Sequence, residues 1–170
     1  LGDVYKRQEE EVSETIESDV FGSILHKVME ELYKPFQGKM VTVDLLKAIR
    51  KDTALLTGAI ARAFASEFFK TEVVRSLTGQ NYLIGEMIRK YVGKILERDG
   101  KLTPFVYIES ERKINGLISL SDHSEIRLKG FIDRVDEVRD AIRIIDYKSG
   151  SGTTTFSSIE SLSLIHISEP

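Results

Sequence analysis

Residues 129–150, KGFIDRVDEVRDAIRIIDYKSG, decide the fold that we predict for this chain. Two runs in which apolar and polar residues alternate, 129–138 and 142–148, lie on either side of a short polar break. Alternation over runs of this length is typical of β-strands, and a short break between two such runs is typical of a hairpin turn. We therefore expect an antiparallel β-hairpin that turns near Asp140.

The expected hairpin brings acidic and basic side chains to one patch of the sheet. Asp146 and Lys148 share a face, because side chains two residues apart on a strand point the same way. Antiparallel pairing then places Asp133 of the first strand beside Asp146 or Tyr147. Two carboxylates this close repel each other unless a cation lies between them, and hard oxygen ligands suit magnesium or manganese. The alternative is a surface hairpin whose aspartates and lysine face water, since aspartates are common near turns.

Two segments of the hairpin carry a resemblance to a known family. Residues 130–136, GFIDRVD, followed by residues 145–150, IDYKSG, resemble the core of the PD-(D/E)XK nuclease superfamily, and within it the RecB/AddB-like exonuclease domains. The resemblance implies that Asp133 and Asp146 bind a metal ion and take part in catalysis. It also implies that Lys148 is a catalytic residue.

A helix near the N-terminus supplies a further candidate ligand. Apolar residues recur with helical periodicity over residues 20–33, and Asp19 can cap this helix. His26 lies on the flank of the apolar stripe, where the pattern alone indicates a surface or boundary residue. The segment FGSILH, which ends at His26, and the EELY that follows it resemble the family's first motif, a G-x-x-x-H helix. That resemblance implies that His26 is a third metal ligand, beside the two aspartates and the backbone carbonyl of Tyr147.

Residues 19–98 have the pattern of a helical region. Thr42 or Asp44 can cap a second helix, and the alanine-rich apolar run at 53–70 predicts a buried one. We expect the last helix at 82–96. The region resembles the helical insertion that RecB-like domains carry between the histidine helix and the sheet.

Residues 104–148 have the pattern of a β-sheet that opens after a turn at Asp99-Gly100. A strand expected over residues 105–114 carries Glu109 and Glu111 on one face. In the family, a glutamate lies on the strand that precedes the G-x-x-D-R segment, so both are candidate accessory residues, and the strand phase slightly favours Glu111. The alternative is an exposed strand face with alternating charge.

Both ends of the chain carry a pattern that indicates a foreign origin. DNA that encodes residues 2–8, GDVYKRQ, has a reverse complement that encodes residues 162–168, LSLIHIS. Two protein ends related in this way resemble an inverted adapter from library preparation. We therefore expect residues 1–8 and 162–170 to be adapter-derived, and residues 9–161 to be the authentic part of one domain.

The composition bounds the class of protein. A chain of 170 residues with 41% apolar residues can form one domain with its own core. It has no cysteine, which excludes disulfides, thiolate zinc sites and iron–sulfur clusters built from this chain. A formal net charge of −3 argues against a free-standing protein that grips DNA through a basic surface. No apolar run approaches membrane-spanning length and no signal peptide is visible, so we expect a cytoplasmic protein.

These observations predict an α+β fold of the restriction-endonuclease-like type, with a mixed β-sheet core, flanking helices and a helical insertion. The resemblance implies a DNA nuclease domain dependent on Mg²⁺ or Mn²⁺, in a recombination-repair exonuclease or helicase–nuclease subunit. Its expected partners are DNA and a helicase. One alternative is a nuclease-fold module that binds DNA ends or a partner helicase without cutting. Another is a purely structural domain, which would bind no metal.

Overall fold

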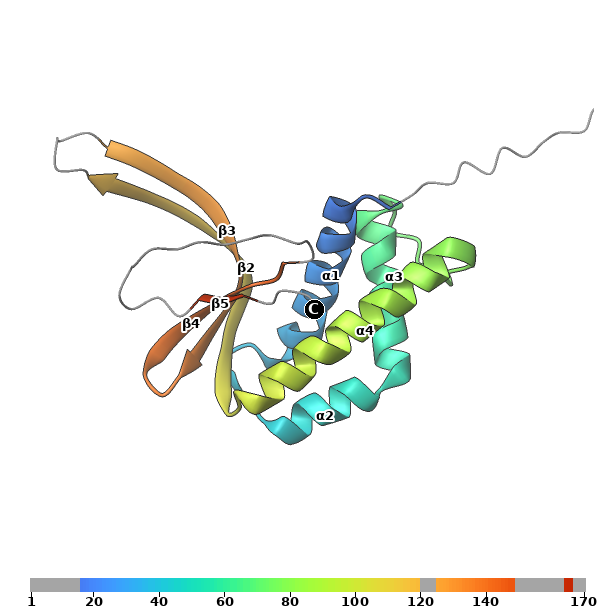
Figure 1. Ribbon diagram of the computed structural model, residues 1–170, viewed down its shortest axis with the longest axis horizontal. Helices are drawn as coiled ribbons and strands as arrows, with labels where there is room; N and C mark the ends of the chain where they lie inside the picture. The colour runs from blue at the N-terminus through green and yellow to red at the C-terminus, as the bar shows by residue number, and fades with distance from the viewer. Residues whose placement is uncertain (1–15, 120–124, 149–163, 167–170) are drawn as a thin grey trace, which may run out of the picture.

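The structure, a computed structural model, describes residues 16–119, 125–148 and 164–166. Within them, four α-helices lie on one side of a five-stranded β-sheet (Figure 1). In order across the sheet, the strands are β1 (Lys39–Val41), β2 (Phe105–Ser119), β3 (Glu125–Val138), β4 (Ala141–Asp146) and β5 (Leu164–His166). The first four strands are antiparallel neighbours and β5 is parallel to β4. The predicted α+β class and mixed sheet are therefore confirmed.

The helices are α1 (Ser18–Tyr33), α2 (Val43–Lys51), α3 (Thr53–Glu67) and α4 (Gly79–Lys101), and a 3₁₀ turn, η1 (Lys34–Phe36), follows α1. Thr42, one of the two expected caps, accepts the backbone N–H of Leu45 at the start of α2. The prediction that Asp19 caps α1 is wrong, because Glu17 occupies the N-cap position. Asp19 instead lies in the first turn, where its negative charge favours the helix dipole.

α4 extends beyond the predicted range of 82–96 at both ends, and the turn expected at Asp99-Gly100 is wrong. The backbone stays helical as far as Lys101. The Asp99 side chain is buried and forms an ion pair with Arg134 of β3. This contact between distant parts of the chain outweighs the local preference of an Asp-Gly pair for a turn.

The β3–β4 hairpin forms as predicted. Its two turn residues, 139–140, have φ values of 48° and 66°, the conformation of tight turns that match the twist of the flanking strands. The register pairs Arg134 with Ile145. By the same register Asp133 lies opposite Asp146, which is one of the two arrangements expected from the sequence.

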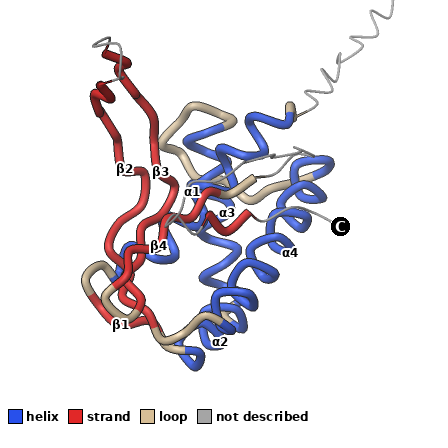
Figure 2. Tube along the Cα trace, turned by 60° about the vertical axis from the view of Figure 1, so that its left-hand side comes forward, coloured by secondary structure: helices blue, strands red, loops and turns tan. Residues whose placement is uncertain are grey.

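β2 and β3 continue beyond the rest of the sheet as a two-stranded arm (Figures 1 and 2). The sequence pattern favours one strand over residues 105–114 and a further short strand from residue 117, whereas β2 is continuous to Ser119. It is continuous because its pairing with β3 runs as far as the pair Ser119–Glu125. The strand neighbours β1 and β4 border the other end of these two strands, near the helices.

The apolar core lies between the helices and the inner face of the sheet. Tyr33 at the end of α1 packs against Phe105 and Tyr107 of β2, with ring centroids 6.4 Å and 5.5 Å apart. On the helical side, α1 packs against α3, whose inner residues include the small, fully buried Ala59 and Ala63. Each large apolar side chain buried here contributes roughly 1.5–3 kcal/mol. The helix that carries His26 is thereby held against the sheet.

A buried ionic cluster joins α4 to the sheet. The guanidinium of Arg134 is fully buried and donates to both carboxylate oxygens of Asp99, at 2.6 Å and 2.9 Å. It also donates to Asp136 at 3.1 Å, and Arg143 donates to the same Asp136 oxygen at 2.6 Å. Tyr33 donates its hydroxyl hydrogen to Asp99 at 2.5 Å. The positive charges of two arginines and the negative charges of two aspartates therefore balance inside the protein.

β5 lies within residues 162–170, the C-terminal segment that the sequence marks as adapter-derived. It pairs with β4 through Ile144–Leu164 and the two following pairs. Residues 1–8, the other such segment, lie outside the described residues. The foreign origin of both ends, and with it the domain boundary at 9–161, stays a prediction.

Replacing Asp99 tests the contribution of the ionic cluster to stability. Asp99→Ala should lower the free energy of unfolding by about 3–5 kcal/mol, because the buried charge of Arg134 loses its bidentate partner. Urea unfolding followed by circular dichroism measures this change. Asp44→Ala removes an exposed aspartate from the first turn of α2 and should cost less than about 1 kcal/mol. Equal losses in the two variants would show that the ion pair adds no net stability.

Candidate metal centre

His26 projects from the flank of α1 toward the end of β4. Its Nε2 lies 2.8 Å from the backbone carbonyl oxygen of Tyr147. Because a carbonyl oxygen only accepts hydrogen bonds, Nε2 carries the hydrogen in this contact and Nδ1 faces two carboxylates. Nδ1 lies 3.5 Å from Oδ1 of Asp133 and 3.9 Å from Oε1 of Glu111. A proton on Nδ1 or a metal ion can occupy the space between these three atoms.

His26, Glu111 and Asp133 form a group whose potential ligand atoms all lie within 4.8 Å of one another. The three residues come from α1, β2 and β3, so the tertiary fold assembles the group. An imidazole nitrogen with carboxylate oxygens is a donor set that divalent cations accept, including Mg²⁺ and Mn²⁺. A divalent metal fits this group, because its charge would offset the repulsion between the carboxylates.

Asp133 lies at the centre of the site. Its side chain is largely buried, and its Oδ2 accepts the backbone N–H of Tyr147 at 2.5 Å. Burial raises the pKa of the Asp133 carboxyl to about 6, and the neighbouring Asp146 carboxyl adds to this rise, against the opposing effects of His26 and the Tyr147 N–H. Asp133 is therefore a carboxyl whose charge a bound cation would stabilise.

The structure distinguishes Glu109 from Glu111, the two candidate accessory residues between which the sequence does not decide. The strand pairs on either side of Glu111 place it opposite Asp133, and its φ is 55°. The β2–β3 register also shifts between Tyr107 and Glu109, and irregularities of this kind often re-aim side chains beside active sites. Glu111 joins the group of candidate ligands, whereas Glu109 forms an ion pair with Arg112 at 3.1 Å.

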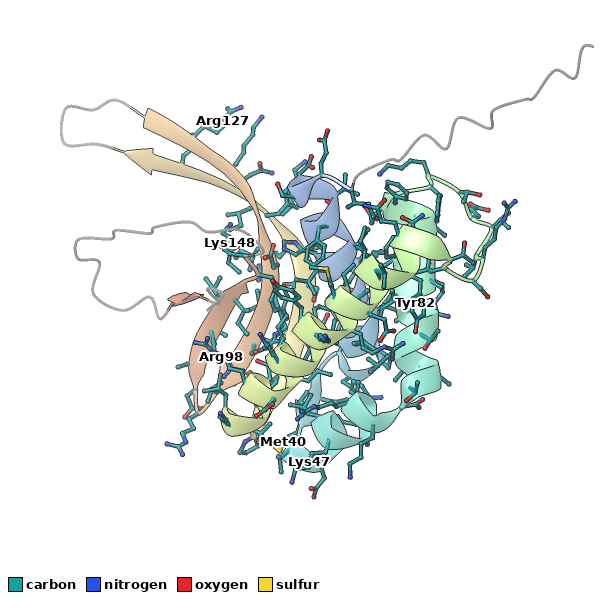
Figure 3. The ribbon with its side chains drawn as sticks, turned by 45° about the vertical axis from the view of Figure 1, so that its right-hand side comes forward. Met40, Lys47, Tyr82, Arg98, Arg127 and Lys148 are labelled. Carbon is teal, nitrogen blue, oxygen red and sulfur yellow. The ribbon has the colours of Figure 1, made fainter. Side chains whose placement is uncertain are left out.

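Asp146 and Lys148 lie beside the group and contact each other. The Lys148 ammonium is 2.9 Å from Oδ2 of Asp146, although β4 ends at Asp146 and the strand expected to reach residue 148 stops two residues earlier. The hydrogen bond with Asp146 raises the pKa of Lys148, so its positive charge is retained. Asp146 also contacts Asp133, although the three-residue group above does not include it. Lys148 is half exposed and lies beside the strands at the level of α1 (Figure 3).

A cavity of about 400 Å³ opens beside the candidate ligands. It is lined by Ser23, His26, Lys27, Glu30, Glu67 and Glu111. A larger cavity of about 710 Å³ lies between α3 and α4, and none of the candidate ligands lines it. The smaller cavity gives access to His26 and Glu111, whereas the larger one touches no candidate ligand in the described part of the chain. The chemistry of the side chains therefore identifies the site, and the size of the cavity does not.

The residues that hold Tyr147 in place were not predicted from the sequence. Arg134 donates a hydrogen bond to the Tyr147 hydroxyl at 2.7 Å, on the core side of the sheet. A signal was present, because Arg134 and Asp136 lie two residues apart on β3 and so share one face of the strand. Two opposite charges at buried strand positions indicate an internal ion pair.

Comparisons with known proteins find two similarities. Residues 2–163 match the sequence profile of the PD-(D/E)XK nuclease superfamily. A similar protein is an ATP-dependent helicase/deoxyribonuclease subunit of Latilactobacillus sakei subsp. sakei (strain 23K), which is 26% identical over 167 residues. The match covers 89% of this chain and 14% of that protein, so the chain spans a small part of its relative's length. None of the helices in the described residues is both long and apolar enough to cross a membrane.

The raised pKa of Asp133 predicts that protons and metal compete for this site. The carboxyl ionises near pH 6, so it is charged at pH 7.5 and increasingly neutral as the pH falls below 6. The apparent affinity for Mn²⁺ should therefore fall by about tenfold per pH unit below 6. Isothermal titration calorimetry between pH 7.5 and pH 4.5 measures it, and Asp133→Asn should remove this part of the dependence. An affinity that is constant through pH 6 would contradict a role for Asp133 as a ligand.

Proposed function

The chain belongs to the PD-(D/E)XK nuclease superfamily, and on that premise we propose that it is a metal-dependent DNA nuclease domain that hydrolyses phosphodiester bonds. Its α+β architecture with a mixed sheet is the restriction-endonuclease-like fold of that superfamily. The observation that carries the proposal is the convergence of His26, Glu111 and Asp133 from three separate elements. A surface hairpin with solvated carboxylates would not bring in a histidine from α1.

We propose that His26, Asp133 and Asp146 hold the metal, with Glu111 as an accessory ligand, and that the Tyr147 backbone carbonyl becomes a further ligand when it no longer accepts the hydrogen bond from His26. Mg²⁺ is the proposed ion, with Mn²⁺ as a substitute, because most of these donors are oxygens. When bound, such an ion lowers the pKa of a coordinated water and polarises the scissile phosphate. The raised pKa of Asp133 supports this ligand set, because burial and Asp146 both disfavour its charge when no cation is present.

Lys148 is the proposed catalytic cation. Its ammonium is paired with Asp146, half exposed, and close to the carboxylates without being buried among them. From this position it can orient the attacking water or stabilise the negative charge that develops on the phosphoryl oxygens. Water oxygen forms the new P–O bond in line with the departing oxygen, the old P–O bond breaks, and the departing oxygen takes a proton.

The finer role proposed for the domain is in a recombination-repair exonuclease or helicase–nuclease subunit. The similar Latilactobacillus protein is named as an ATP-dependent helicase/deoxyribonuclease subunit, which supports DNA as substrate and a helicase as partner. The net charge of −3 on the chain agrees with a basic DNA-binding groove supplied by the rest of such an assembly. A cytoplasmic location follows from the proposed substrate.

Variants of Lys148 and Asp146 test the mechanism. Lys148→Ala should bind Mn²⁺ as tightly as the unchanged chain, because it removes no ligand, while cleavage falls by about two to three orders of magnitude. Asp146→Ala should weaken Mn²⁺ binding and abolish cleavage together. The measurements are calorimetric Mn²⁺ titration and cleavage of linear duplex and single-stranded DNA with Mg²⁺ or Mn²⁺.

The matched control is Lys47→Ala, which removes an exposed lysine of α2 at the far end of the molecule from Lys148 (Figure 3). Cleavage by this variant should be unchanged. Equal cleavage by Lys148→Ala and the unchanged chain would overturn the role of Lys148. Metal binding without cleavage of either DNA would favour the module that binds DNA ends or a helicase without cutting.

A further inference from the structure

Tyr147 connects two parts of the molecule that otherwise have separate roles. Its side chain is buried on the core side of the sheet, where its hydroxyl accepts a hydrogen bond from Arg134 at 2.7 Å. Its backbone lies at the candidate metal centre, where the N–H donates to Asp133 at 2.5 Å and the carbonyl accepts from His26 at 2.8 Å. One residue therefore joins the ionic cluster to two candidate ligands.

The backbone of Tyr147 needs this anchor because it lies outside the strand ladder. β4 ends at Asp146, and the pairs between β3 and β4 extend only to Arg134–Ile145. Beyond a strand end, ladder hydrogen bonds no longer fix the peptide orientation. The buried phenol, held by a guanidinium, supplies a fixed point directly next to the two peptide groups that touch His26 and Asp133.

Arg134 is itself rigidly held. Both oxygens of Asp99 accept from it, Asp136 accepts a further hydrogen bond, and its guanidinium lies 4.4 Å from the ring centroid of Tyr33. A planar guanidinium with several partners in fixed directions can position a hydroxyl in a way that a single flexible ammonium cannot. The geometry of the cluster is thereby transmitted to the Tyr147 hydroxyl.

We propose that Arg134 is a positioning residue for the metal centre, acting through the Tyr147 hydroxyl on the peptide groups that orient His26 and Asp133. This proposal rests on the proposed function, because it assigns the ionic cluster to the same metal site. Partners that lie one contact beyond metal ligands commonly change metal affinity by 10- to 100-fold when they are removed. A cluster that serves stability alone would have no such effect.

Two tyrosine variants separate these roles. Removing Arg134 itself would leave Asp99 and Asp136 uncompensated in the core, so the phenol is the better target. Tyr147→Phe deletes the hydroxyl that Arg134 holds. Tyr33→Phe deletes an equally buried hydroxyl that touches the same cluster through Asp99, but the Tyr33 backbone is part of α1. Both variants lose one hydrogen bond of the cluster, and only Tyr147→Phe loosens the peptide groups at the site.

The first measurement is amide hydrogen exchange of residue 147 in the metal-free 170-residue chain, followed by NMR. Exchange of this amide should become about tenfold faster in Tyr147→Phe and stay within about twofold in Tyr33→Phe. The ¹⁵N signals of the His26 ring report the hydrogen bond from Nε2 and should shift in Tyr147→Phe alone. Equal exchange rates and equal ring signals in the two variants would overturn the positioning role.

The second measurement is calorimetric titration with Mn²⁺ at pH 7.5. Tyr147→Phe should bind Mn²⁺ about tenfold more weakly than Tyr33→Phe when both are folded. Equal Mn²⁺ affinities in the two variants would also overturn the proposal. If the unchanged chain binds no Mn²⁺, the proposed metal site fails, whereas the exchange measurement made without metal still decides whether Arg134 positions Tyr147.

Discussion

The rest of the structure depends on the ion pairs that the buried guanidinium of Arg134 forms with Asp99 and Asp136. Moving a charge of this kind from water into a protein core costs several kcal/mol unless hydrogen-bonding partners of opposite charge surround it. Asp99 from α4 and Asp136 from β3 supply these partners for the two terminal nitrogens of Arg134, while its Nε has none among the described residues. The rings of Tyr33 and Phe105 lie against the guanidinium. α4 can supply Asp99 only if it stays helical past the residues where the sequence indicates a turn. The position of one charge in the sheet thus determines where a helix ends.

The same cluster places the sheet relative to α1, and the candidate metal centre lies where these elements meet. His26 and Tyr33 are on one helix, so the packing of Tyr33 against Phe105, Tyr107 and Arg134 also determines where the His26 imidazole arrives. It arrives beside Asp133, a carboxylate that is costly to keep charged without a cation, as its raised pKa indicates. Tyr147 therefore links two sets of charged residues. One is the neutralised ionic cluster on the inner face of the hairpin, and the other is the set of candidate carboxylate ligands near its end. Protein charges compensate the first, whereas a bound cation would compensate the second.

Much of the candidate site could be predicted from the sequence because it depends on local geometry. A two-residue turn with strands that alternate every second residue determines which side chains of the hairpin face one another. The convergence of Asp133, Asp146 and Lys148 follows from that pattern, while their roles and that of His26 rested on the resemblance to family motifs. The choice between Glu109 and Glu111 could not be settled in this way. It depends on a shift of register in β2 and a positive φ at Glu111, and neither alters the alternation of residue types in the sequence.

The sequence by itself determined the class of fold, the hairpin, the helix that carries the histidine and the acidic chemistry of the site. Periodicity and turn preference act over a few residues, so a single chain is enough to reveal them. The tertiary structure alone decided that Arg134 lies in the core, that Asp99 belongs to α4, and that Glu111 faces His26. Arg134 and Asp99 lie 35 positions apart in the chain, and His26 and Tyr147 lie 121 apart. Electrostatic pairing depends on distance in space and not on distance along the chain, and only the folded arrangement of helices and strands sets that distance.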